Sequence, residues 1–119
     1  MREITLRERC ALRGAAMAEL QTLEQQISAL ARSFDDIVAG QSLVNTDDEH
    51  DPEGSTIAFE RSQVSALLRQ AKDDRTALLM SLTRMDEPGY GVCEVCKEFI
   101  GVERLLVLPA ATKCINCAR

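Results

Sequence analysis

Residues 93–117 read CEVCKEFIGVERLLVLPAATKCINC and contain two Cys-x-x-Cys pairs separated by seventeen residues. Each two-residue gap lets a tight turn point both sulfurs at the same metal ion, so this spacing predicts one tetrahedral zinc site. The predicted ligands are Cys93, Cys96, Cys114 and Cys117. Because four protein ligands leave zinc no open position for water or substrate, we expect one structural Zn²⁺ ion and no enzymatic activity.

The segment around these cysteines is too short to build a core of its own. Pro88 and Gly89 are expected to end a preceding helix, and the composition then changes to that of a zinc ribbon. The apolar side chains available to it are few: Ile100, Leu105, Val107 and Ile115. We therefore predict a zinc module over residues 88–119 that depends on its metal for folding.

Two apolar seams at heptad spacing precede this module. The first consists of Ala16, Leu20, Leu23, Ile27, Leu30, Phe34, Ile37 and Val44, and the second of Ile57, Val64, Leu68, Ala71, Leu78, Leu82 and Met85. Arg61 and Arg75 interrupt the second seam. The seams predict a mostly α fold in which residues 1–87 form an antiparallel coiled-coil hairpin, with arms of about 28 residues that reach about 40 Å each. An ordinary bundle or a homodimeric coil would show the same seams.

The polar turn between the seams, at about residues 45–55, is strongly acidic. Residues 33–60 contain eight acidic residues and no Lys or Arg, in a chain whose net charge is −5. Such a stretch is repelled by a phosphate backbone and is suited to a basic protein surface or a metal ion. A solvated acidic loop without a partner is the alternative. Pro52 suits the first position of the second helix, with Asp51 before it as a cap.

Other features limit the classes of function. Residues 88–119 have a net charge of only +1 and one Tyr and one Phe, which argues against sequence-specific DNA binding. The first ten residues contain neither a signal peptide nor a membrane span, so we expect a cytoplasmic protein without a membrane partner. In a reducing compartment the paired cysteines are metal ligands rather than disulfides, and Cys10 is expected to be a small packed hydrophobe.

The predicted zinc module contains a specific set of residues in addition to its four cysteines. These are Tyr90-Gly-Val-Cys93-Glu-Val-Cys96, Ile100, Arg104-Leu105, Pro109 and Cys114-Ile-Asn-Cys117, placed behind a hairpin with an acidic tip. In this combination the chain resembles the DksA/TraR family of bacterial transcription regulators. The resemblance implies a factor that binds RNA polymerase, whose coiled coil enters the secondary channel and whose acidic tip alters the stability of promoter complexes.

The resemblance also implies which residues act. The Asp-x-x-Asp motif of the family is matched here by Asp48-Glu-His-Asp51, with Asp47, Glu49 and Glu53 contributing to the field. Pairing through Asp51-Pro-Glu-Gly54 instead would put glycine where a second aspartate is expected. Some members respond to guanosine tetraphosphate through basic residues, but this chain has Gln70, Asp74 and Ala77 at about those places, so that site is not carried over. A structural coiled-coil and zinc module that forms homo-oligomers without polymerase is the alternative function.

Overall fold

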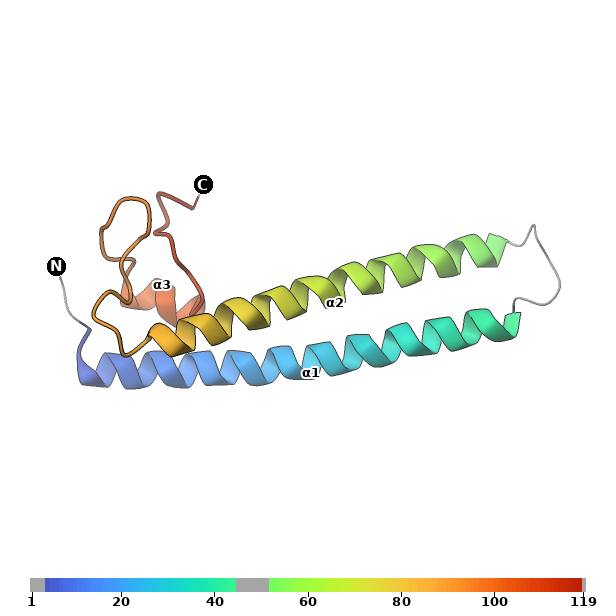
Figure 1. Cartoon of the computed structure of the whole chain (residues 1–119), viewed down its shortest axis with the longest axis horizontal. Helices are drawn as coiled ribbons and strands as arrows, with labels where there is room; N and C mark the ends of the chain where they lie inside the picture. The colour runs from blue at the N-terminus through green and yellow to red at the C-terminus, as the bar shows by residue number, and fades with distance from the viewer. Residues whose placement is uncertain (1–3, 45–51, 119) are drawn as a thin grey trace. The chain divides into compact units, whose positions relative to one another are not determined.

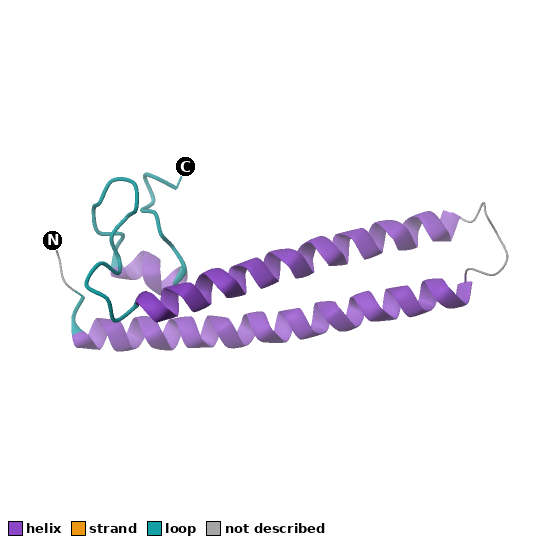
Figure 2. Ribbon diagram, viewed as in Figure 1, coloured by secondary structure: helices purple, strands orange, loops and turns teal. Residues whose placement is uncertain are grey.

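The computed structural model describes residues 4–44 and 52–118, with side chains described at 4–40 and 56–118. Within these ranges it contains three helices: α1 (Leu6–Val44), α2 (Pro52–Arg84) and α3 (Val102–Val107) (Figure 1). The same ranges contain no strand beyond an isolated antiparallel bridge between Val92 and Phe99 (Figure 2). The mostly α prediction is therefore confirmed, although α1 has 39 residues and α2 has 33, more than the predicted 28.

The chain divides into two compact units, and both contain parts of α1 and α2. One unit consists of Met1–Thr22 and Asp74–Arg119, which we call the zinc-end unit, and the other is Leu23–Asp73. In each unit the α1 and α2 segments run antiparallel (Figure 1). The antiparallel pairing of helices that the two seams predict is thus present in each unit taken by itself.

The core of the zinc-end unit is built from all three helices. Its most deeply buried side chains, each at most 1% exposed, include Leu12, Ala16, Leu78, Met85 and Leu105. Leu12 and Ala16 belong to α1 and Leu78 to α2, whereas Leu105 comes from α3. The zinc module therefore contributes a core side chain to the packed ends of the helices.

Polar contacts fix the start of α1 in this unit. The Thr5 hydroxyl accepts a hydrogen bond from the Glu8 N–H at 3.1 Å, and the Glu8 carboxylate accepts one from the Thr5 N–H at 3.0 Å, which is a capping box. Arg9 donates to the Met85 carbonyl at 2.8 Å, and Arg13 pairs with Asp86 at 3.0 Å. The beginning of α1 is thereby held against the segment that follows α2.

The other unit, Leu23–Asp73, buries the middle of both seams. Leu23, Ile27 and Ala71 are less than 9% exposed. The remaining seam residues with described side chains in this unit are half-buried: Leu30, Phe34, Ile37, Ile57, Val64 and Leu68. The seams therefore pack on each other within one chain. Arg61 is also half-buried and has an interaction partner, so it belongs to the packed face rather than to open solvent.

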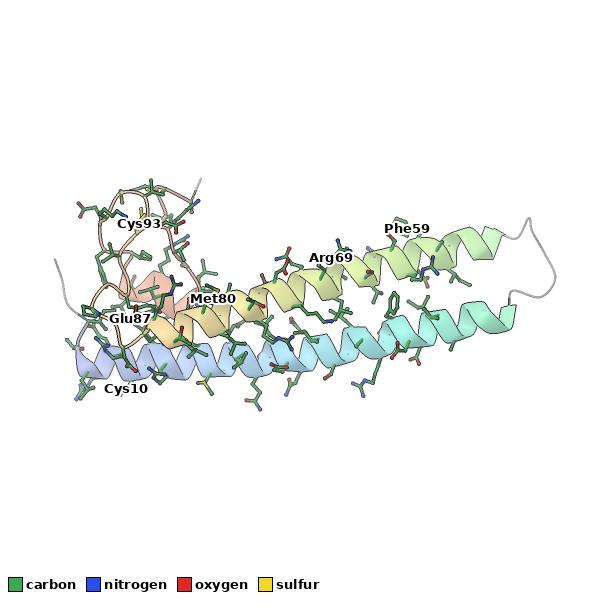
Figure 3. The ribbon with its side chains drawn as sticks, viewed as in Figure 1. Cys10, Phe59, Arg69, Met80, Glu87 and Cys93 are labelled. Carbon is green, nitrogen blue, oxygen red and sulfur yellow. The ribbon has the colours of Figure 1, made fainter. Side chains whose placement is uncertain are left out.

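Two further observations bear on the sequence predictions. Cys10 is exposed on α1, on the side facing away from α2 (Figure 3), so the expectation of a packed hydrophobe is wrong. The pattern failed because Cys10 lies beside the seam rather than on it: Leu12 and Ala16 occupy the buried face. Among the described residues, no helix combines the length and the apolar character that crossing a bilayer requires.

Adjacent leucines on α2 provide a test of this packing. Leu78 is 1% exposed and Leu79 is 44% exposed. We expect Leu78→Ala to lower the free energy of unfolding by about 2–5 kcal/mol, because it removes buried apolar atoms and leaves a cavity. Leu79→Ala, the matched control, should change it by less than about 1 kcal/mol. Urea unfolding of the zinc-loaded protein, followed by circular dichroism, measures both; equal losses would contradict the packing.

Candidate metal centre

Both Cys-x-x-Cys pairs are closed by the same backbone hydrogen bond, from the residue after the second cysteine to the carbonyl of the first. In the first, the Lys97 N–H donates to the Cys93 carbonyl at 3.0 Å, and in the second the Ala118 N–H donates to the Cys114 carbonyl at 3.0 Å. Lys97 has a φ of 66°, a left-handed conformation that turns the chain back after Cys96. The repeated turn points the two sulfurs of each pair to one side, as the spacing predicts.

Hydrogen bonds between distant segments bring the two turns together. The Glu94 N–H in the first turn donates to the Thr112 carbonyl at 2.9 Å, just before the second pair. From α3, Arg104 Nε donates to the Lys113 carbonyl at 3.1 Å, while the neighbouring Leu105 is fully buried. Arg104 therefore attaches the approach to Cys114 to a helix that the core already holds.

The four sulfurs form a cluster of the right size for zinc (Figure 3 labels Cys93). All four Sγ atoms lie within 4.8 Å of one another, and the Sγ atoms of Cys96 and Cys114 are 3.7 Å apart. Tetrahedral coordination with zinc–sulfur bonds of about 2.3 Å places two sulfurs about 3.8 Å apart, whereas a disulfide requires about 2.05 Å. The cluster is thus able to bind one zinc ion and shows no disulfide.

The protonation of the thiols also fits a cation at the centre. Backbone N–H groups, first that of Cys96 and then that of Cys114, lower the pKa of Cys93 to about 6. The Cys114 thiol, followed by burial and the other two thiols, raises the pKa of Cys117 to about 12. Four thiolates crowded this closely repel one another, and a bound divalent cation removes that penalty and deprotonates its ligands. Cys93 and Cys114 are buried, while Cys96 is exposed, so the cluster sits at the edge of the module.

Gly91 occupies the tightest backbone position beside this cluster. Its φ is +92°, and a Cβ added there would lie 2.9 Å from the Phe99 ring and 3.3 Å from Ile4. We expect Gly91→Ala to destabilise the module by about 1–3 kcal/mol through backbone strain and this clash. Since folding and metal binding are coupled, zinc affinity should fall about tenfold.

Competition with a chromophoric zinc chelator measures that affinity, and Gly89→Ala is the control. A Cβ at Gly89 meets no atom within 4 Å. Zinc affinity should therefore be unchanged in Gly89→Ala. If Gly91→Ala bound zinc as tightly as Gly89→Ala, the close approach of Gly91 to Phe99 would have no energetic role.

The predicted tip residues are not brought into this site. Asp47, Asp48, Glu49 and Asp51 lie outside the described residues, and Glu53 is in the first turn of α2 with its side chain not described. In the chain, Asp47, Asp48, Glu49 and Asp51 fall between the end of α1 at Val44 and the start of α2 at Pro52. Pro52 is the first residue of α2, as the sequence predicts. Their role at the tip stays a prediction.

Sequence reasoning missed several residues that hold the site in place. The capping box had a readable signal, since Thr5-Leu-Arg-Glu8 matches the Ser/Thr-x-x-Glu pattern before an apolar run. The run after Ile100 had the composition of a zinc ribbon, yet residues 102–107 form α3. No pattern within the run predicted the bond from Arg104 to the carbonyl before Cys114, because it depends on tertiary structure.

Comparisons with known proteins agree with this architecture. Residues 88–119 match the family described as the prokaryotic dksA/traR C4-type zinc finger. The whole fold is similar to the solved structure of transcription factor DksA2 from Pseudomonas aeruginosa, with a TM-score of 0.76 and 22% sequence identity. That alignment covers 97% of this chain and 83% of the DksA2 chain. No curated protein sequence matches the chain.

Proposed function

We propose that the protein is a transcription regulator that binds RNA polymerase, because residues 88–119 match the prokaryotic dksA/traR C4-type zinc finger. In this proposal the acidic tip of the hairpin enters the secondary channel and changes the stability of promoter complexes. A role of the transcription-factor type is supported by the zinc-finger match and by the similarity of fold to a transcription factor. Beyond that role, we propose that the partner is RNA polymerase and that the acidic tip produces the effect on promoter complexes.

The observation that carries the proposal is a four-cysteine cluster that matches a dksA/traR zinc finger, together with two long antiparallel helices in the same chain. Cys93, Cys96, Cys114 and Cys117 are the residues that we propose hold the zinc, with sulfur spacing that suits it. Four thiolates complete the coordination of the ion, so its chemistry here is to fix the fold of the module and not to activate water. We accordingly propose a regulator without enzymatic activity.

The charge of the connection between the helices supports an action on a basic or metal-containing surface. Asp47, Asp48, Glu49 and Asp51 fall within the seven residues between the end of α1 and the start of α2. Four carboxylates in so short a segment attract cationic protein elements and magnesium ions, both of which surround a polymerase active centre. We propose that Asp48 and Asp51 produce the effect, and that Asp47, Glu49 and Glu53 add to the negative electrostatic potential around them.

The alternative of a homo-oligomeric coil has less support from the packing. Such a coil needs the apolar seam to face a second copy. Here Leu12 and Leu78 are 1% exposed, and Leu23, Ile27 and Ala71 are less than 9% exposed within a single chain. The surface that the alternative would use is already occupied.

Equilibrium binding to purified core RNA polymerase tests the proposed partner. Cys10 is exposed, and zinc protects the other four thiols, so a maleimide dye can be attached at Cys10 alone. Titration of the labelled, zinc-loaded protein with core polymerase should raise fluorescence anisotropy at micromolar concentrations or below, and excess unlabelled protein should reverse the rise. No binding at micromolar polymerase would sink the proposed function and favour a structural module.

A further inference from the structure

A groove on the zinc-end unit is lined by residues that include neither the four cysteines nor the tip residues. Its volume is about 750 Å³. It is lined by Glu8, Ile100, Gly101, Val102, Glu103, Arg104, Val107, Leu108 and Ile115. All of these residues belong to the same compact unit, so the groove is a feature of one packed body.

Three apolar side chains of this groove are exposed to solvent. Val107 is 76% exposed, Leu108 is 48% exposed, and Ile115 in the second cysteine turn is 63% exposed. Leu105, in contrast, is fully buried, so α3 places one face in the core and leaves apolar residues at its end outside. Neighbouring exposed apolar side chains that line one groove mark a surface for interaction more than a scattered set does.

The groove is held in shape by contacts already described. Arg104 Nε donates to the Lys113 carbonyl at 3.1 Å, which ties α3 to the turn that carries Ile115. Leu105 anchors the same helix in the core. A partner that enters a preformed groove loses less free energy to ordering than one that must organise it.

Charges at the groove indicate what kind of segment it accepts. Glu8 and Glu103 contribute two carboxylates against the single guanidinium of Arg104, so the lining has an excess of negative charge. The Glu8 carboxylate also accepts the Thr5 N–H at 3.0 Å, and the Arg104 Nε donates to the Lys113 carbonyl. An apolar segment with a cationic flank is therefore complementary to the groove, whereas one with an acidic flank is not.

The size of the patch decides between a second copy and a short segment. A stable dimer requires about 800 Å² of buried surface on each partner, and a few partly exposed aliphatic side chains supply much less. We propose that this groove binds a short amphipathic segment of a protein partner, which inserts two or three apolar side chains and places Lys or Arg against Glu8 and Glu103. This docking site goes beyond the proposed action of the tip and does not depend on it.

Two model peptides test the proposal. Both are fluorescein-labelled twelve-residue helix formers with leucines on one face, and they differ only in carrying lysines or glutamates on the other. Anisotropy titrations with the zinc-loaded full chain should show binding of the lysine peptide and at least tenfold weaker binding of the glutamate peptide. Equal affinity for the two peptides, or no binding of either, would overturn the proposal.

Variants locate the binding site. The double variant Val107→Ser, Leu108→Ser should lower the affinity for the lysine peptide at least tenfold. Ile115→Ser, on a different segment, should lower it at least threefold. The control is Phe59→Ser with Leu67→Ser, two exposed apolar residues of α2, which should change nothing. Zinc content confirms that each variant is folded. Unchanged affinity in both groove variants, or a dimer in sedimentation that Val107→Ser dissolves, would overturn the short-segment assignment.

The outcome for the groove can be separated from that for the tip. Core polymerase binding and promoter-complex lifetime are measured for the Val107→Ser, Leu108→Ser variant alongside peptide binding. Loss of peptide binding with an unchanged lifetime effect supports an independent docking site. If the variant keeps full peptide binding, the groove is not the docking site, whatever the result for polymerase binding.

Discussion

Replacing Cys93 by serine is expected to release the zinc ion and unfold the chain from about residue 85 to residue 118, while most of α1 and α2 remains helical. Cys93 is fully buried and its sulfur lies in the four-thiol cluster. Structural zinc supplies on the order of 10 kcal/mol in small modules, and the described module has no sheet to replace that term. This is the largest stability effect that we predict for a single substitution.

Hydrogen exchange on the zinc-loaded protein and on the variant measures the effect segment by segment. Amide protection at Glu94, Ile100 and Leu105 should be lost in Cys93→Ser and, reversibly, after chelation of zinc from the native chain. Cys10→Ser is the matched control, since Cys10 is exposed on α1 outside the cluster. It should keep its zinc and its protection. If Cys93→Ser kept both, the cluster would not be the element that folds the module.

Exchanging Asp48 and Asp51 together for asparagine is expected to abolish the effect on promoter-complex lifetime while leaving polymerase binding within about twofold. The double substitution removes two charges but keeps the size of both side chains. If the carboxylates act on cations near the active centre, losing them should reduce the effect at least about tenfold, equivalent to about 1.4 kcal/mol. In the proposed mode of action other surfaces of the chain also contact the polymerase, so binding should persist.

A matched pair on α1 controls for overall charge. Asp35 and Asp36 are exposed acidic neighbours within the described part of the chain, so Asp35→Asn with Asp36→Asn makes the same change of charge away from the tip. We expect this control to keep the full effect on lifetime in a competitor-challenge assay on preformed complexes. Equal loss in both double variants would mean that net charge, and not the tip, is what matters.

The helical part of the fold could be predicted from sequence because burial there follows a repeating pattern. In the Leu23–Asp73 unit, every seam residue with a described side chain proved buried or half-buried. The residues at which helices end were harder to predict from the sequence. α2 ends at Arg84, four residues before Pro88, and the residues that follow it, Met85 and Asp86, are engaged by Arg9 of α1.

The metal site shows the same division between local and tertiary information. Cys-x-x-Cys spacing fixes a local turn, so the ligand set could be named from the chain alone. The contacts that place the second pair beside the first join Glu94 to Thr112 and Arg104 to Lys113, across 18 and 9 positions of sequence. Nothing in a local pattern specifies such pairs. Likewise, the groove beside Val107 exists because α3 buries Leu105 in the core and leaves Val107 exposed. A run of apolar residues in the sequence does not show which of them will be buried.

The most direct test of the central claim is a photo-crosslink from the tip. A photoreactive residue placed at Thr46, between α1 and α2, is activated in a complex with core RNA polymerase, and the same residue placed at Thr22 on α1 serves as the comparison. We predict that Thr46 crosslinks to polymerase segments beside the catalytic centre and that Thr22 does not. A complex that forms but crosslinks from Thr46 only to the outer surface of the polymerase would contradict an action through the secondary channel.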